Sequence, residues 1–119
     1  MALLNTWENT IGHIVKRYES TEYCFETRIA GADVEVGQAV TEAVAGTVEI
    51  PVDGTLALSG IVCTAGLEGE QVVVLVRGSA IVTDSITLGG TLDIAEASED
   101  LLALDILVRA DGAPYAFGR

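Results

Sequence analysis

The sequence has few of the residues that most catalytic and metal sites use. Its 119 residues include one His, His13, and two Cys, Cys24 and Cys63, whose positions match no metal-ligand spacing. It has no GxSxG and no Gly-Lys-Ser/Thr phosphate loop, and nothing in the spacing brings a Cys to His13. We therefore predict that the protein is not an enzyme, and that it has no catalytic residues, no metal-binding or cofactor-binding residues and no cofactor.

Basic residues are also scarce. Six Lys and Arg stand against eighteen Asp and Glu, so the formal net charge is -12. Such a surface repels phosphate backbones and anionic lipid, and the charge keeps a hydrophobic chain soluble. No apolar run is long enough to span a bilayer, and the first residues lack the basic and apolar regions of a signal peptide. We expect a protein made in the cytoplasm, with no direct nucleic-acid partner and no membrane partner.

Aromatic residues make up only 5% of the chain, whereas half of its residues are hydrophobic. The core must therefore be aliphatic. Thirteen glycines separate many short apolar runs, which favours one mainly β domain. Two buried free thiols at Cys24 and Cys63 are favoured over a disulfide, because the cytosol is reducing.

The stretch from Leu56 to Thr83 organises this domain. Three runs rich in Val, Ile and Leu, at Leu56–Cys63, Gln71–Val76 and Ser79–Thr83, are separated by short glycine-containing breaks. β-Branched residues pack well on a pleated, half-buried surface, and such breaks are typical of turns and bulges. The pattern predicts a central three-stranded meander.

The N-terminal residues differ from this stretch. Residues 1–20 hold the only Trp, and their apolar residues recur at roughly helical spacing, which predicts a weakly helical or extended arm. Thr21–Ile29 then alternates, with Tyr23, Phe25 and Ile29 on one face, as in a half-exposed strand. The apolar side chains of the arm need a partner, which is either another chain or the core of the same domain.

Three further elements follow from local patterns. Thr47–Val52 alternates like a strand that lies at a sheet edge or ends at Pro51. Ser98 is a candidate N-cap for one short helix before the final strand, Asp105–Ala110. The turn signal Asp111–Gly112 then precedes a tail with two aromatic residues.

The order of several short motifs adds a resemblance. The motifs are Gly37–Gln38–Ala39–Val40, Gly60–Ile61–Val62, the acidic turn Glu68–Gly69–Glu70, the run from Val72 to Val82, and Ile106–Arg109. In this order, with an edge strand after the first motif and a short helix before the last, they resemble the small head decoration proteins of tailed bacteriophages. These are the lambda-type capsid-stabilising, or cement, proteins. The resemblance covers about residues 31–110.

The resemblance implies a small β-barrel or β-tulip-like domain with one short helix near the C-terminus and an N-terminal arm. It also implies a homotrimer on the outer surface of the capsid, at threefold sites, where it clamps neighbouring subunits of the major capsid protein. Carried onto this chain, residues 1–29 are the arm that contacts the capsid or a neighbouring subunit, and residues 30–119 are the decoration domain. The expected partner-binding residues in the arm are Trp7, Ile11, Ile14, Tyr23 and Phe25.

Two other functions stay open from the sequence. One is a β module of a phage tail tube or baseplate. The other is a small cytoplasmic β-barrel that binds a ligand or a partner, for which the arm would already be folded on its own core.

Overall fold

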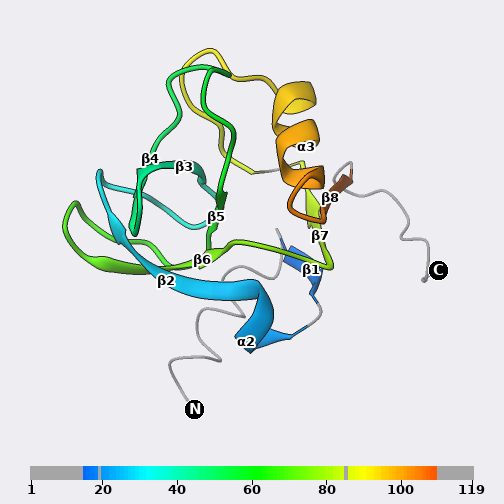
Figure 1. Cartoon of the computed structure of the whole chain (residues 1–119), viewed down its shortest axis with the longest axis horizontal. Coiled ribbons are helices and arrows are strands. Elements are labelled where there is room, and N and C mark those ends of the chain that lie inside the picture. Colours follow the sequence, from blue (N-terminus) through cyan, green and yellow to red (C-terminus); the bar gives the residue numbers. More distant parts are fainter. Residues whose placement is uncertain (1–14, 19, 85, 110–119) are drawn as a thin grey trace.

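Two β-layers and two short helices make up the part of the chain that the computed structural model describes, which is residues 15–109 except residues 19 and 85. The elements in chain order are β1 (Val15–Tyr18), α2 (Thr21–Cys24), β2 (Phe25–Ala30), β3 (Ala39–Val44), β4 (Thr47–Glu49), β5 (Gly60–Val62), β6 (Gln71–Leu75), β7 (Ala80–Thr83), α3 (Ile94–Leu102) and β8 (Ile106–Arg109). Figure 1 shows α3 beside β7 and β8, with the barrel strands on the other side.

Five strands form a closed barrel in the order β2-β4-β3-β5-β6. The barrel closes because β2 pairs with β4 in parallel and with β6 in antiparallel, from Phe25 opposite Leu75 to Ile29 opposite Gln71. Closure leaves no free edge in this sheet. The sequence predicts that this strand either lies at a sheet edge or ends at Pro51. The second arrangement is the one observed, since β4 ends before Pro51. The prediction of a mainly β, small barrel domain is confirmed.

The predicted meander is only partly correct. β5 and β6 pair in the barrel, but β7 belongs to a second sheet with the order β1-β7-β8. The chain leaves the barrel at Gly78, where an added Cβ would lie 1.8 Å from the Asp105 carbonyl oxygen, so only glycine fits. β1 lies antiparallel to β7, whereas β8 lies parallel to it and is reached through α3.

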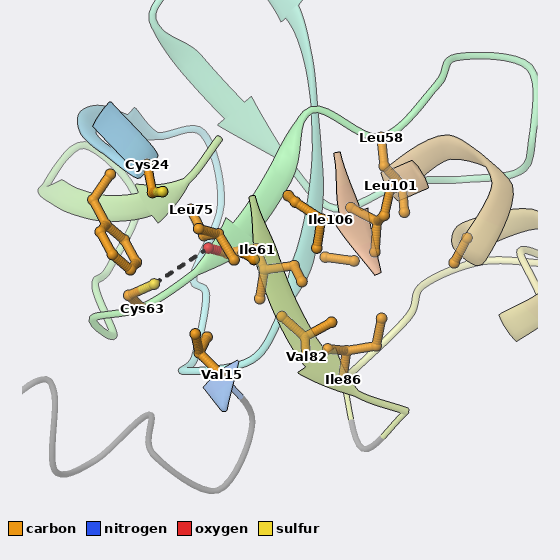
Figure 2. Packing of buried hydrophobic residues seen from close by; sticks show 14 of the residues in the cluster. Val15, Cys24, Leu58, Ile61, Cys63, Leu75, Val82, Ile86, Leu101 and Ile106 are labelled. Carbon is orange, nitrogen blue, oxygen red and sulfur yellow. Dashed lines mark hydrogen bonds between the residues drawn. The ribbon is translucent and has the colours of Figure 1, made fainter. Parts of the chain in front are cut away.

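Valine fills the inside of the barrel. Eight buried residues form this cluster: Ala30, Val34, Val40, Val48, Val62, Val72, Val74 and Val76. A second core lies between the barrel wall and the second sheet with α3. Figure 2 shows Ile61 and Leu75 from the barrel meeting Val82, Ile106 and Leu101 from the other layer.

Both cysteines belong to this second core. Cys24 and Cys63 are free thiols with no exposed surface, as the sequence predicts. The Cys63 Sγ donates to the Ile61 carbonyl oxygen at 3.6 Å, and burial raises the pKa of the Cys63 thiol to about 12. A thiol in such surroundings behaves as a small apolar side chain.

The short C-terminal helix begins earlier than predicted. Its N-cap is Asp93, whose side chain accepts from the Glu96 N–H, while the Glu96 side chain accepts from the Asp93 N–H. This reciprocal pair is a capping box. The helix therefore starts after Asp93, and the predicted N-cap Ser98 lies in the middle of α3. Ala97 and Leu101, one turn apart, are the helix residues buried against the second core.

The predicted boundary after residue 29 also needs correction. β1 pairs with β7, Val15 is part of the second core, and β2 is a barrel strand. The single strand predicted over Thr21–Ile29 is instead the one-turn helix α2 followed by β2. Residues 15–29 are therefore part of the folded domain, because both sheets take a strand from them. Residues 1–14 lie outside the described part of the chain.

Candidate functional site

The structure describes two of the five predicted partner-binding residues. Trp7, Ile11 and Ile14 lie outside the described residues. Tyr23 lies on α2 with half of its surface exposed, whereas Phe25 is 7% exposed and belongs to the second core. The Phe25 ring packs edge-to-face on Tyr18, with centroids 4.9 Å apart. Phe25 is thus corrected from a contact residue to a core residue, since its strand continues into the barrel.

Tyr23 is contacted by Arg77, which lies two residues after the end of β6. The Arg77 Nη1 donates to the Tyr23 carbonyl oxygen at 2.6 Å, and the guanidinium carbon lies 5.4 Å from the centre of the Tyr23 ring. The Tyr23 N–H donates to the Ser20 Oγ at 3.1 Å. A cation over an aromatic face is attracted by the ring quadrupole. Arg77 therefore contacts both the backbone and the ring of this half-exposed residue.

Arg77 also belongs to a chain of ion pairs that joins the end of β6 to β2 and β3. It pairs with Glu26, Glu26 pairs with Arg28 at 2.9 Å, and the Arg28 Nε pairs with Glu42 at 3.0 Å. Glu26 and Arg28 lie opposite Val74 and Val72 in the register, on the side of β2 that faces the barrel interior. The charged side chains thus lie beside the valine cluster.

These ion pairs change the acidity of their members. Hydrogen bonds from Arg77 and Arg28 hold the pKa of Glu26 below its ordinary value. Partial burial opposes ionisation of Glu42, but the Gly46 N–H at 2.8 Å and Arg28 outweigh it, so the pKa of Glu42 is also lowered. Burial likewise disfavours the charge on Arg28, and its two carboxylates still raise its pKa. All three groups therefore stay ionised at neutral pH.

Sequence reasoning missed this network. The alternation over Thr21–Ile29 puts Glu26 and Arg28 together on the face opposite Phe25, because residues two apart in a strand share one face, but it does not name their partners. Arg77 meets Tyr23 across 54 positions of sequence. No local pattern signals that contact, because it depends on which strand lies beside β2.

Exposed apolar side chains gather at three other places. Val52 and Leu56 lie on the loop before β5, and Leu67 lies on the β5–β6 turn. Leu102 and Leu107 border a hollow of about 320 Å³ beside the start of β7 and β8. Scattered single apolar residues are normal on a protein surface. Leu102 and Leu107 lie together at one hollow, whereas Leu67 alone borders another, of about 520 Å³.

The carboxylates do not converge on a metal site. Within residues 15–109, leaving out 19 and 85, there is no group of three or more His, Cys, Asp or Glu side chains placed to hold a metal ion. Over the same residues, neither helix has the length and apolar character needed to cross a membrane.

Comparison with known proteins adds no relative. No protein-family model matches the sequence. A search of curated proteins gives no match either.

Proposed function

We propose that the protein is a structural virion protein that binds the outer surface of a bacteriophage capsid. In this proposal it sits as a homotrimer at threefold sites and stabilises the shell by clamping subunits of the major capsid protein. The proposal rests on the positions in the fold of the five sequence motifs that resemble those of the decoration proteins. Three of the five motifs each fall on a single strand or turn, and the other two, Gly37–Val40 and the run from Val72 to Val82, each span a turn and the strand or strands beside it.

The agreement extends to individual motifs. Gly37, with φ of 92°, makes the turn that enters β3, and Gly60–Ile61–Val62 is β5. The acidic motif Glu68–Gly69–Glu70 is the turn between β5 and β6, where Gly69 has φ of 92°. Ile106–Arg109 is β8. Positive φ at two of these glycines gives a physical reason for the residue type, because other side chains rarely adopt it.

The physics of a clamp fits a module of this kind. A closed barrel with a second packed layer is stiff, so few degrees of freedom are lost when it binds a surface. Several copies joined in a trimer and repeated over a lattice gain avidity without a strong single contact. Tyr23, half exposed and in contact with Arg77, is the type of residue that anchors protein interfaces. Residues 1–14, with Trp7, Ile11 and Ile14, would supply the rest of the contact.

The test is binding to capsids of the source virus that lack this protein. We would compare the full chain, a chain without residues 1–14, and Tyr23→Ala. The truncation ends at residue 14 because Val15 and β1 belong to the core. Leu67→Ala is the matched control, since Leu67 is 62% exposed but lies on the turn at the other end of β6.

We expect saturable binding by the full chain in multiples of three per lattice site, with a raised capsid rupture temperature. Both effects should be lost on truncation and weakened by Tyr23→Ala, while Leu67→Ala behaves like the full chain. Absence of binding by the full chain would refute the proposal and favour a tail module or a free binding module. Equal weakening by Leu67→Ala would refute the assignment of Tyr23.

A further inference from the structure

β8 is the edge strand of the second sheet. Its hydrogen bonds to β7 show which of its backbone groups face β7 and which face outwards. The Ala80 N–H donates to the Asp105 carbonyl oxygen at 3.2 Å, and the Asp84 N–H donates to the Arg109 carbonyl oxygen at 2.8 Å. In a parallel ladder, alternate residues of a strand bond to the same neighbour. The backbone carbonyl groups of Asp105, Leu107 and Arg109 therefore face β7.

The backbone groups of Ile106 and Val108 point to the opposite side. Within the described residues, β8 pairs with no strand other than β7, so these N–H and C=O groups have no ladder partner there. The Ile106 side chain itself has no exposed surface, and Val108 packs against the second core. An edge of this kind is a template for one more strand.

The sequence after β8 matches this template. Residues 110–119 lie outside the described part of the chain, and Asp111–Gly112 is a strong signal for a two-residue hairpin turn. Such a turn would set Val108 opposite Tyr115 as a hydrogen-bonded pair and Arg109 opposite Pro114 as a non-hydrogen-bonded pair. Proline is tolerated at the second kind of position, because its nitrogen faces away from the neighbour.

The same register continues along the strand. Ile106 would fall opposite Phe117, again as a hydrogen-bonded pair, and Leu107 would fall opposite Ala116 as a non-hydrogen-bonded pair. Both residues with unpaired outer groups thus meet residues able to pair with them. Tyr115 and Phe117 would share the sheet face of Val108 and Ile106, which is the core face, and the small Ala116 would share the face of Leu107.

We propose that the outer edge of β8 is a docking site for an extended strand, and that its occupant is residues 113–117 of the same chain. The second sheet would then have four strands in the order β1-β7-β8 and the C-terminal strand. The proposal is independent of the capsid function, because it concerns one chain in solution.

Amide hydrogen exchange measured by NMR tests the proposal at single residues. In the full chain, the Ile106 and Val108 amides should exchange about 100-fold or more slowly than in an unstructured peptide, since sheet hydrogen bonds open only in larger unfolding events. A chain that ends at Ala110 should bring both rates to within about tenfold of the unstructured value. Gly112→Val, which places a β-branched residue where φ must be positive, should have the same effect.

Two controls keep the result interpretable. The Leu107 amide faces β7, so its slow exchange in every variant reports that the sheet is still folded. A chain that lacks only Gly118 and Arg119 should keep full protection, because these residues lie beyond the paired register. Fast exchange at Ile106 and Val108 in the full chain, or protection that survives the longer truncation, would overturn the proposal. Protection that depends on protein concentration would also overturn it, because the occupant would then come from a second copy.

Discussion

Arg28→Met removes the cation that lies between Glu26 and Glu42 and keeps most of the apolar stem. Arg28 and Glu42 are each about one-fifth exposed (19% of the side chain), whereas Glu26 is 36% exposed. Exposed pairs contribute about 0.2–1 kcal/mol, and hydrogen bonds to charged groups in less solvated places about 1.5–3 kcal/mol. The Glu42 contact should therefore dominate. We expect the free energy of unfolding at pH 7 to fall by about 1–3 kcal/mol.

The pH dependence of this loss is a second, sharper signature. The pKa values of Glu26 and Glu42 are lowered in the folded state. The stability that these groups contribute is therefore complete above the ordinary pKa of 4.5 that they have in the unfolded chain, and it is lost as the pH falls through their lower pKa values in the folded state. Protonated carboxyls no longer need Arg28, so the difference between the wild-type protein and Arg28→Met should shrink towards pH 3.

The assay is urea unfolding followed by far-UV circular dichroism at pH 7 and at pH 3. Glu42→Gln and the double variant complete a cycle, in which the second substitution should cost less than it does alone. The reasoning would be refuted by an Arg28→Met protein whose free energy of unfolding at pH 7 lies within about 0.5 kcal/mol of the wild-type value, which is the error of extrapolation for a domain of low stability. An equal loss at both pH values would refute the electrostatic explanation.

Three further predictions concern the helix and the second core. Asp93→Ala should lower the free energy of unfolding by about 0.5–2 kcal/mol in the same urea assay, because it removes the N-cap of α3. Leu101→Ala should lower it by about 2–5 kcal/mol by leaving a cavity, whereas Leu102→Ala, at a position 60% exposed, should cost less than about 1 kcal/mol. Thiol titration at pH 8 should find Cys63 unreactive until denaturant is added, because burial raises its pKa to about 12. The unfolded chain loses this proton first, so stability should also fall as the pH rises from the ordinary thiol value of 9.0 towards 12, and rapid labelling of the native protein would contradict the assignment.

Much of the fold follows from local pattern. The strands β6, β7 and β8 lie within a residue or two of the predicted runs, because continuous β-branched residues between glycine turns have few other stable arrangements. Local pattern does not predict which strands pair with one another. Gln71–Val76 and Ser79–Thr83 read as neighbours in one sheet, but the bend at Gly78 sends β7 to β1. Nothing in either run encodes that choice.

The candidate site was harder to predict for the same reason. Tyr23 is a predicted partner-binding residue and is half exposed, but the residue that contacts it, Arg77, follows the neighbouring strand β6, far away in the sequence. Phe25 has the same residue class and lies two positions away, yet it is buried because β2 begins there. The N-cap at Asp93 did have a local signal, the Asp-x-x-Glu spacing to Glu96, which is stronger than a lone Ser98.

The use of residues 15–30 in both layers has a consequence for synthesis of the chain. β1 pairs with β7, and β2 pairs with β6. Because these partner strands are synthesised later, neither sheet can be completed until at least residue 75 has left the ribosome. Contacts between distant segments form slowly, because a long loop must close before they stabilise anything. During that interval the apolar strands are exposed, and the excess of negative charge would keep nascent chains apart.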